Sequence, residues 1–481
     1  NRKLTLLTDL YELTMMQGYF LENRNERAVF DVFFRRNPCG NSYSIAAGLE
    51  QVIDYVKSLR FDEDDLAYLS SLNLFQEDFL DYLRHFKFTG DIYAVPEGSL
   101  IFPNEPIIKV IAPIKEAQLL ETAILNIVNH QSLIATKAAR VKCAAENDSV
   151  LEFGLRRAQG PDAGVYGARA AVIGGCSSTS NVLAGQMFNI PVSGTHAHSW
   201  IMSFKDEYTA FKKYAEAFPD AAILLVDTYD TLRSGVPNAI RVFKEMFESG
   251  KEPKLYGIRL DSGDLAYLSK RARKMLDDAG FTSAVISASS DLDEYLIQSL
   301  KSQGAKISVW GVGTNLITSK DCPAFGGVYK LSAIENEEGI LEPKIKLSEN
   351  PEKVTNPGNK KIYRVYDKAS GKLKADLITL EHEVFNEDES LLLFDPNATW
   401  KRTTLKPGTF TLRELLVPIF KSGECVYDCP ETMDIKKYCQ SELDSLWPES
   451  KRLLNPHTIF VDLSPELFAL KNSLLHSINT N

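Results

Sequence analysis

The sequence predicts an α/β protein that contains an irregular, incomplete (β/α) barrel and an additional mixed α+β domain. Between Ser149 and about Leu331, short apolar runs alternate with helical segments, which is typical of a parallel sheet. Strand-like runs broken by Pro and Gly lie before and after this region. With 481 residues and 44% hydrophobic content, the chain is too long for one ordinary core, so several domains are expected.

The mixed domain is expected over residues 1–115, completed by about residues 332–400. Its first helix should begin at Asp9, because Asp9 and Glu12 have the spacing of a capping box and precede an apolar stripe. A strand-like run follows over residues 28–38. After the barrel the sequence becomes strand-like again, which indicates that this later segment completes the first sheet.

The barrel-like domain is expected over residues 116–331. It opens with about 30 residues of dense helical periodicity, and roughly six or seven apolar strands follow, too few for a complete eight-unit barrel. The remaining residues, 401–481, are expected to form a smaller appended segment.

Composition indicates which classes of binding partner and which cellular compartment to expect. The 54 basic and 64 acidic residues give a formal charge of −10, which disfavours nucleic acid and anionic membrane surfaces. The opening segment lacks the apolar core of a signal peptide, and no run reaches the roughly 18 apolar residues of a membrane span. Seven thinly spread cysteines favour reduced thiols and the cytoplasm. Cys425, Cys429 and Cys439 can also be interpreted as a loose metal knuckle, although a fourth ligand is not obvious.

Nearly every predicted barrel strand ends in polar side chains. In a parallel barrel the active site lies at the carboxyl ends of the strands, so these side chains should converge on one face. In chain order they are Arg156 and Arg157; Ser177, Ser178 and Thr179; Thr195, His196 and His198; Asp227 and Asp230; Arg259 and Asp261; Ser289 and Asp291; Gly313 and Thr314.

The residue types at these strand ends suit an anionic, phosphate-bearing ligand. Arginine offers a planar fork for phosphate or carboxylate, and the glycine-rich turn at residues 311–315 allows backbone amides to approach a phosphate. Arg259 followed by Asp261 suits a ribose that carries a phosphate, since the carboxylate can accept from sugar hydroxyls. A structural ion pair is the plain alternative for these two residues.

The pair His196 and His198 allows two interpretations. Alternate residues of a strand face one way, so both imidazoles can face a common metal, or one of them can be a nucleophile or base. A metal site needs further ligands at other strand ends, and histidine is absent from all of them. A single reactive histidine with an orienting carboxylate is therefore preferred, with Asp227 or Asp230 nearest by topology.

Several blocks resemble the nicotinate phosphoribosyltransferase family. They occur in the family's order from the N-terminus to about Leu331. The blocks are TDLYELTMMQGYF, FDVFFRRNP, LEFGLRRAQGPDAG, GGCSSTSNVLAG, SGTHAHSW, GIRLDSGDL, GVGTN and GGVYKL.

This resemblance implies a type II phosphoribosyltransferase fold and a homodimer whose active sites lie at the subunit interface. It also implies formation of nicotinate mononucleotide and pyrophosphate from nicotinate and PRPP, driven by ATP, with Mg²⁺ accompanying the phosphates. The residue matching His198 is transiently phosphorylated in such enzymes, and His198 and Asp261 are the expected catalytic residues.

The resemblance also assigns ligand-binding residues. Nicotinate is expected to contact Tyr11, Phe153, Thr195 and Arg259, with Tyr11 contributed by the other subunit. The PRPP and phosphate groups are expected to contact Arg156, Arg157, Thr179, Asn181, Gly313 and Thr314.

Two functions from other classes remain as alternatives. One is a metal-dependent barrel hydrolase that uses His196 and His198, and the other is a non-catalytic nucleotide-binding protein. Within the favoured class, nicotinamide or quinolinate can replace nicotinate, because a single arginine contact decides which acid is accepted.

Overall fold

The structure is a computed structural model that describes residues 3–250, 253–350 and 353–479. Its contacts divide the chain into two compact units. The first comprises residues 1–133, 324–430 and 437–481, and the second comprises residues 134–323 and 431–436. Within the described ranges, no helix is long and apolar enough to cross a membrane.

The first unit contains two main sheets. Its larger sheet has seven strands in the order β13-β12-β1-β5-β3-β19-β20, with antiparallel pairs throughout. The strands are β1 (Arg27–Phe34), β3 (Asp91–Ala94), β5 (Ile108–Pro113), β12 (Gly327–Glu335), β13 (Leu341–Pro343), β19 (Val417–Lys421) and β20 (Glu424–Cys425).

The second sheet of this unit has four strands in the order β18-β14-β15-β21, and two short pairs, β2-β4 and β16-β17, accompany it. The strands are β14 (Lys360–Asp367), β15 (Leu373–Leu380), β18 (Phe410–Glu414), β21 (Phe460–Leu463), β2 (Ser44–Ile45), β4 (Leu100–Ile101), β16 (Leu391–Phe394) and β17 (Arg402–Leu405).

Helices cover one face of the larger sheet. Phe30, Val32 and Phe34 alternate along β1 and point into the main apolar core with the helices, while Asp31 and Phe33 point to the opposite face. The helices of this unit are α1 (Leu10–Leu21), α2 (Leu49–Ser58), α3 (Glu63–Ser71), α4 (Glu77–Arg84), α5 (Ile114–Leu119) and α16 (Pro465–Asn479); α6 (Glu121–Ala145) and α15 (Thr432–Ser445) each have residues in both units.

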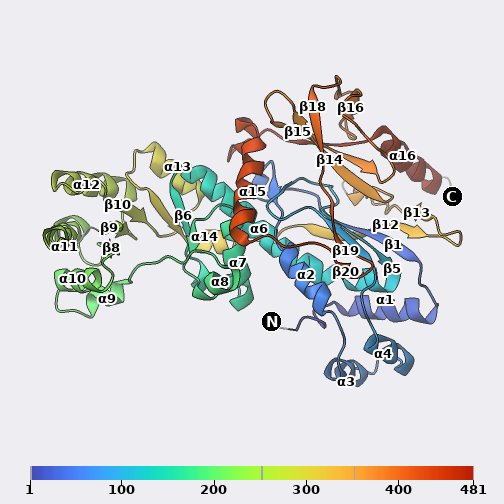
Figure 1. The fold of residues 1–481 in the computed structure, drawn as a ribbon, viewed down its shortest axis with the longest axis horizontal. Coiled ribbons are helices and arrows are strands. Elements are labelled where there is room, and N and C mark those ends of the chain that lie inside the picture. Colours follow the sequence, from blue (N-terminus) through green and yellow to red (C-terminus); the bar gives the residue numbers. More distant parts are fainter. Residues whose placement is uncertain (1–2, 251–252, 351–352, 480–481) are drawn as a thin grey trace. The chain divides into compact units, whose positions relative to one another are not determined.

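The second unit is built on an open sheet of six parallel strands in the order β7-β6-β11-β10-β9-β8. This curled half-barrel agrees with the predicted incomplete barrel of six or seven strands. Helices α10 (Glu207–Ala217), α11 (Val236–Glu248) and α12 (Leu265–Asp278) pack along β8, β9 and β10 (Figure 1). The strands are β6 (Ser149–Glu152), β7 (Ser178–Thr179), β8 (Ala221–Leu225), β9 (Leu255–Leu260), β10 (Val285–Ala288) and β11 (Val309–Val312).

Acidic and amide side chains cap the N-termini of several helices of this unit. Asp206, Asp264 and Asp293 accept the N–H of the residue three positions later, which satisfies a helix-end donor at α10, α12 and α13. The helices are α7 (Pro161–Ile173), α8 (Val182–Phe188), α9 (His198–Met202), α10 (Glu207–Ala217), α11 (Val236–Glu248), α12 (Leu265–Asp278), α13 (Glu294–Ser302) and α14 (Thr314–Ile317).

Three local expectations differ from the structure. The first helix begins after Asp9, but no capping box forms, because the Asp9 carboxylate accepts from Thr122 and Glu12 binds Thr8 and Thr122. Strands β12 and β13 complete the first sheet as expected, but β14 and β15 form a separate sheet. The segment after residue 400 supplies strands to both sheets and is not a separate piece.

A buried ion cluster ties the second sheet of the first unit together. Arg364 on β14 is fully buried and donates to Asp376 at 2.6 Å, to Glu442 at 2.8 Å and to the Leu100 carbonyl at 2.8 Å. Burial, followed by the charge of Asp376, raises the pKa of neighbouring Glu105. The guanidinium therefore neutralises carboxylates that would otherwise stand unpaired in a dry interior.

We expect Arg364→Met to lower the free energy of unfolding by about 3–5 kcal/mol, because it leaves buried carboxylates without a counter-charge. Urea denaturation of the full chain measures the change. Arg402→Met, at an exposed position on β17, should change stability by less than about 0.5 kcal/mol. Equal effects of the two substitutions would contradict this role of the cluster.

Candidate active site

The carboxyl ends of β8, β9 and β10 bring a polar cluster together in the second unit. Arg259, one residue before the end of β9, donates through Nε to Ser289 at 2.8 Å and through Nη1 to Thr195 at 2.7 Å. Its Nη2 lies 3.2 Å from Asp261. The guanidinium is held from three sides and its side chain is only 16% exposed.

Asp261 links this arginine to the reactive-histidine candidate. It accepts a short hydrogen bond from Ser289, and its Oδ2 lies 3.7 Å from Nε2 of His198. Burial opposes the charge of Asp261, but Ser289, Arg259 and His198 together hold its pKa below the ordinary value. Asp261 is therefore an ionised carboxylate between two cation-forming groups.

His198 is the first residue of α9, and its side chain is 39% exposed. Nδ1 lies 3.1 Å from the Thr228 hydroxyl. The orienting groups are therefore Thr228 and Asp261, and the expectation of Asp227 or Asp230 is wrong. Asp227 accepts from the N–H of Asp261 and the hydroxyl of Ser262, while Asp230 caps the π-helical turn Thr231–Gly235.

His196 does not share a ligand-facing side with His198. It is buried, its Nε2 accepts the Leu225 N–H at 3.3 Å, and its ring packs edge-on against Tyr214. The pattern of alternating side chains fails because residues 193–197 are not a strand. Among the described residues, no group of three His, Cys, Asp or Glu side chains is arranged to hold a metal ion, either here or at Cys425, Cys429 and Cys439.

Phe153 lies beside this cluster, at the carboxyl end of β6. Its ring covers Gly311 on β11 so closely that a Cβ at Gly311 would lie 2.6 Å from the ring, and the same Cβ would lie 3.5 Å from Ser289. Gly311 therefore allows the aromatic ring to lie across the sheet edge next to the residue that holds Arg259.

A buried carboxylate that the sequence analysis did not single out positions the phosphate-binding candidates. Glu152 accepts from Thr179 at 2.6 Å and from the backbone N–H of Gly154, and burial raises its pKa. Thr179 in turn accepts the N–H of Asn181, whose side chain caps α8 and donates to Gly164. In this arrangement Thr179 and Asn181 shape the loop through internal hydrogen bonds.

The other predicted residues lie at the same edge of the parallel sheet or in the first unit. Arg156 and Arg157 are exposed in the 3₁₀ turn Leu155–Arg157 after β6, and Gly313 and Thr314 begin α14 after β11. Tyr11 belongs to the first unit, on α1, where it is 45% exposed. Burial and then the charges of Glu121 and Glu12 raise its pKa to about 12.

Comparison with known proteins decides the family. Three family models match in chain order: the nicotinate phosphoribosyltransferase N-terminal domain at residues 6–129, the nicotinate phosphoribosyltransferase family at residues 149–374, and the C-terminal domain at residues 359–471. The chain belongs to the nicotinate phosphoribosyltransferase family. It is therefore an enzyme, a transferase, and the resemblance seen in the sequence is confirmed.

Relatives and solved structures agree with this assignment. Nicotinate phosphoribosyltransferase of Bacillus subtilis is 52% identical over 99% of this chain and 96% of its own length. The human protein of that name is 34% identical over 98% of this chain and 96% of its own length. The crystal structure of human nicotinic acid phosphoribosyltransferase superposes with a TM-score of 0.84 at 32% identity, covering 97% of this chain and 99% of that one.

Two residues of this nicotinate phosphoribosyltransferase family member, Thr228 and Glu152, make contacts in the candidate site that the sequence did not predict. Glu152 carried a signal, because it is a charged residue within an otherwise apolar strand. Thr228 carried none, since a threonine between two aspartates is typical of any polar loop.

The burial of His196 predicts a pH effect on stability. Burial lowers its pKa from an ordinary 6.5 to about 4. Between these values the unfolded chain binds the proton and the folded chain does not, so this group makes stability fall as the pH falls from 6.5 towards 4.

We therefore expect wild type to lose roughly 1–2 kcal/mol more stability than His196→Gln between pH 7 and pH 5. Urea denaturation at both pH values measures the difference. His85→Gln, at an exposed position, should retain the wild-type dependence. An identical pH dependence for His196→Gln and wild type would show that His196 is not buried in its neutral form.

Proposed function

We propose that this enzyme joins nicotinate to the ribosyl phosphate of PRPP, releasing nicotinate mononucleotide and pyrophosphate, in the biosynthesis of NAD. The reaction is coupled to ATP hydrolysis through a phosphorylated His198. The observation that carries the proposal is the guanidinium of Arg259, fixed by Thr195, Ser289 and Asp261 beside a partly exposed histidine.

Arg259 and Phe153 suit the two parts of nicotinate. Three of the five guanidinium N–H groups of Arg259 have partners among the described residues, which leaves two donors for a carboxylate. The Phe153 ring lies next to Ser289 and can stack on the pyridine. Tyr11 from the partner subunit of a homodimer is proposed for the other side of the ring. The homodimer and the cytoplasmic location stay predictions from the resemblance and the cysteine usage.

Arg156, Arg157 and the amides of the Gly313–Thr314 turn supply positive charge and donors for the phosphates of PRPP. Mg²⁺ fits the same edge, because Asp227 Oδ1 is buried without a hydrogen-bond partner among the described residues and Asp261 is ionised nearby. Mg²⁺ would neutralise charge on the departing pyrophosphate. Displacement at C1 of the ribose builds positive character on the sugar, so fixed orientation of the two substrates and stabilised leaving-group charge account for the rate.

His198 has the geometry of a phosphoryl acceptor. When Nδ1–H donates to Thr228, Nε2 carries the lone pair, and Nε2 lies beyond hydrogen-bond distance from Asp261. Attack of Nε2 on the γ-phosphorus of ATP forms the N–P bond while the bond to the β-phosphate oxygen breaks and ADP leaves. Water later hydrolyses the phosphohistidine. A dianion at this position can order the surrounding loop against Arg259.

Comparing nicotinate, nicotinamide and quinolinate as substrates tests the proposed reaction. We expect turnover with nicotinate to exceed turnover with nicotinamide at least about tenfold, because an amide cannot satisfy both free donors of Arg259. Arg259→Gln should remove this preference, and Arg271→Gln, an exposed arginine on α12, should keep it. If none of the three bases yields a mononucleotide with PRPP, the proposed function is wrong.

Substitution of His198 tests the coupling to ATP separately. We expect His198→Ala to abolish ATP hydrolysis and acid-labile labelling by γ-labelled ATP, because no imidazole accepts the phosphoryl group, while a slow ATP-independent formation of product remains. His85→Ala should behave as wild type. Full ATP hydrolysis and ATP-stimulated turnover in His198→Ala would rule out the phosphohistidine.

A further inference from the structure

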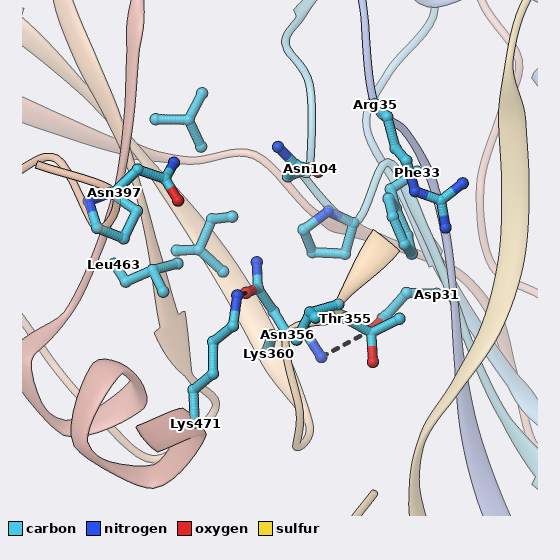
Figure 2. A pocket seen from close by; sticks show the side chains of 15 residues that line it. Asp31, Phe33, Arg35, Asn104, Thr355, Asn356, Lys360, Asn397, Leu463 and Lys471 are labelled. Atoms are coloured by element: carbon cyan, nitrogen blue, oxygen red, sulfur yellow. Dashed lines mark hydrogen bonds and ion pairs between the residues drawn. The ribbon is translucent and has the colours of Figure 1, made fainter. Parts of the chain in front are cut away.

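The first unit contains a cavity of about 280 Å³ that none of the strand-end residues lines. It lies on the face of β1 that points away from the main core, and residues of β14, β15, β21 and α16 also line it (Figure 2). Its polar lining residues are Asp31, Arg35, Asn104, Thr355, Asn356, Lys360, Asn397 and Lys471.

The side chains that line the cavity carry more positive than negative charge. Three are cationic, Arg35, Lys360 and Lys471, and one is a carboxylate, Asp31. Asp31 pairs with Lys360 at 2.7 Å, as the dashed line in Figure 2 marks. The lining therefore holds an excess of two positive charges.

Lys471 is partly buried and has no carboxylate partner among the described residues. Its ammonium reaches from α16 to Asn356, donating to the neutral side-chain oxygen at 2.8 Å (Figure 2). Burial and then the charge of Lys360 lower the pKa of Lys471, so the folded protein holds this ammonium at a free-energy cost.

Carboxylates near this lysine pair are already engaged. Lys360 also donates to the Gly358 carbonyl at 2.6 Å, and burial lowers its pKa despite Asp31. Glu381, an acid outside the lining, is bound by Lys109 at 2.6 Å. No described carboxylate forms an ion pair with Lys471.

Arg35 adds a second unsatisfied cation. Its Nε is buried without a hydrogen-bond partner among the described residues, and its guanidinium lies 5.6 Å from the Phe33 ring centre. The side-chain amides of Asn104 and Asn397 face the same space (Figure 2). Donors thus surround the cavity from several elements, as a tetrahedral oxyanion requires.

We propose that this cavity binds a phosphate group, either inorganic phosphate or the phosphate of a small monoester. A dianion matches the excess charge of two and offers several acceptor oxygens. Aliphatic side chains of Val354, Ile378 and Leu463 complete the wall and suit the short carbon part of an ester. A site with no anionic ligand would be more stable with an apolar side chain at position 471.

Thermal unfolding of the full chain at constant ionic strength, with inorganic phosphate or glycerol 3-phosphate added, tests the site. The unfolding temperature of wild type should rise as ligand is added, because a ligand that binds only the folded state stabilises it. Lys368→Met, a change at an exposed lysine, should show the same rise. Lys471→Met should weaken the apparent affinity at least tenfold. Without ligand it should unfold at no lower temperature than wild type, because it removes a partly buried charge that has no counter-charge.

Arg35→Gln provides a second cavity variant and carries the test if Lys471→Met does not fold. Arg156→Gln, at an arginine proposed to bind the PRPP phosphates, separates this cavity from that site, and it should retain the response. A response only to phosphate, or only to the monoester, supports the site and identifies the ligand. A wild-type response in both cavity variants, or a response lost in Arg156→Gln alone, overturns the proposal.

Discussion

The polar cluster around Arg259, at the carboxyl ends of β8, β9 and β10, depends on the charge of Asp261. This carboxylate accepts from Ser289 and Arg259, faces His198, and has its own backbone N–H bound by Asp227. These contacts join the loops after β8, β9 and β10, so the position of each group is set by the others. If Asp261 were neutral, Arg259 would lose its counter-charge and His198 its neighbouring anion. Preorganisation at this edge is therefore electrostatic, and it comes from hydrogen bonds among the protein's own groups.

A parallel sheet makes such a cluster predictable from sequence. Because all six strands run the same way, their carboxyl ends meet at one edge, and polar residues after apolar runs must lie near one another. The convergence of Arg259, Asp261 and Ser289 follows from this rule, whereas Thr195 lies in a segment that is not a strand. The hydrogen-bond partners do not follow, since they depend on loop conformations of a few residues. Asp227, expected to orient His198, instead binds a backbone N–H of the next loop.

The first unit was harder to predict for a related reason. Strands of an antiparallel sheet alternate apolar and polar residues whichever neighbour they pair with, so β14 and β15 carry no signal that separates them from β12. Arg364 could have been the clue, because a charged residue within a strand needs a buried partner. Its partners, Asp376 and Glu442, lie 12 and 78 residues further along the chain. Pairing at such separations is decided by the folded core and not by local pattern.

The partners of Arg364 and Lys471 show how a charge that stabilises the fold differs from a charge that is suited to bind a ligand. Arg364 is surrounded by two carboxylates and a carbonyl, so its charge is neutralised within the fold and needs nothing further. Lys471 has a neutral amide partner and a like-charged neighbour, so the fold alone does not repay its desolvation. Both residues lie in the same unit. The difference in their partners is the physical reason to assign a structural role to the first and an anionic ligand to the second.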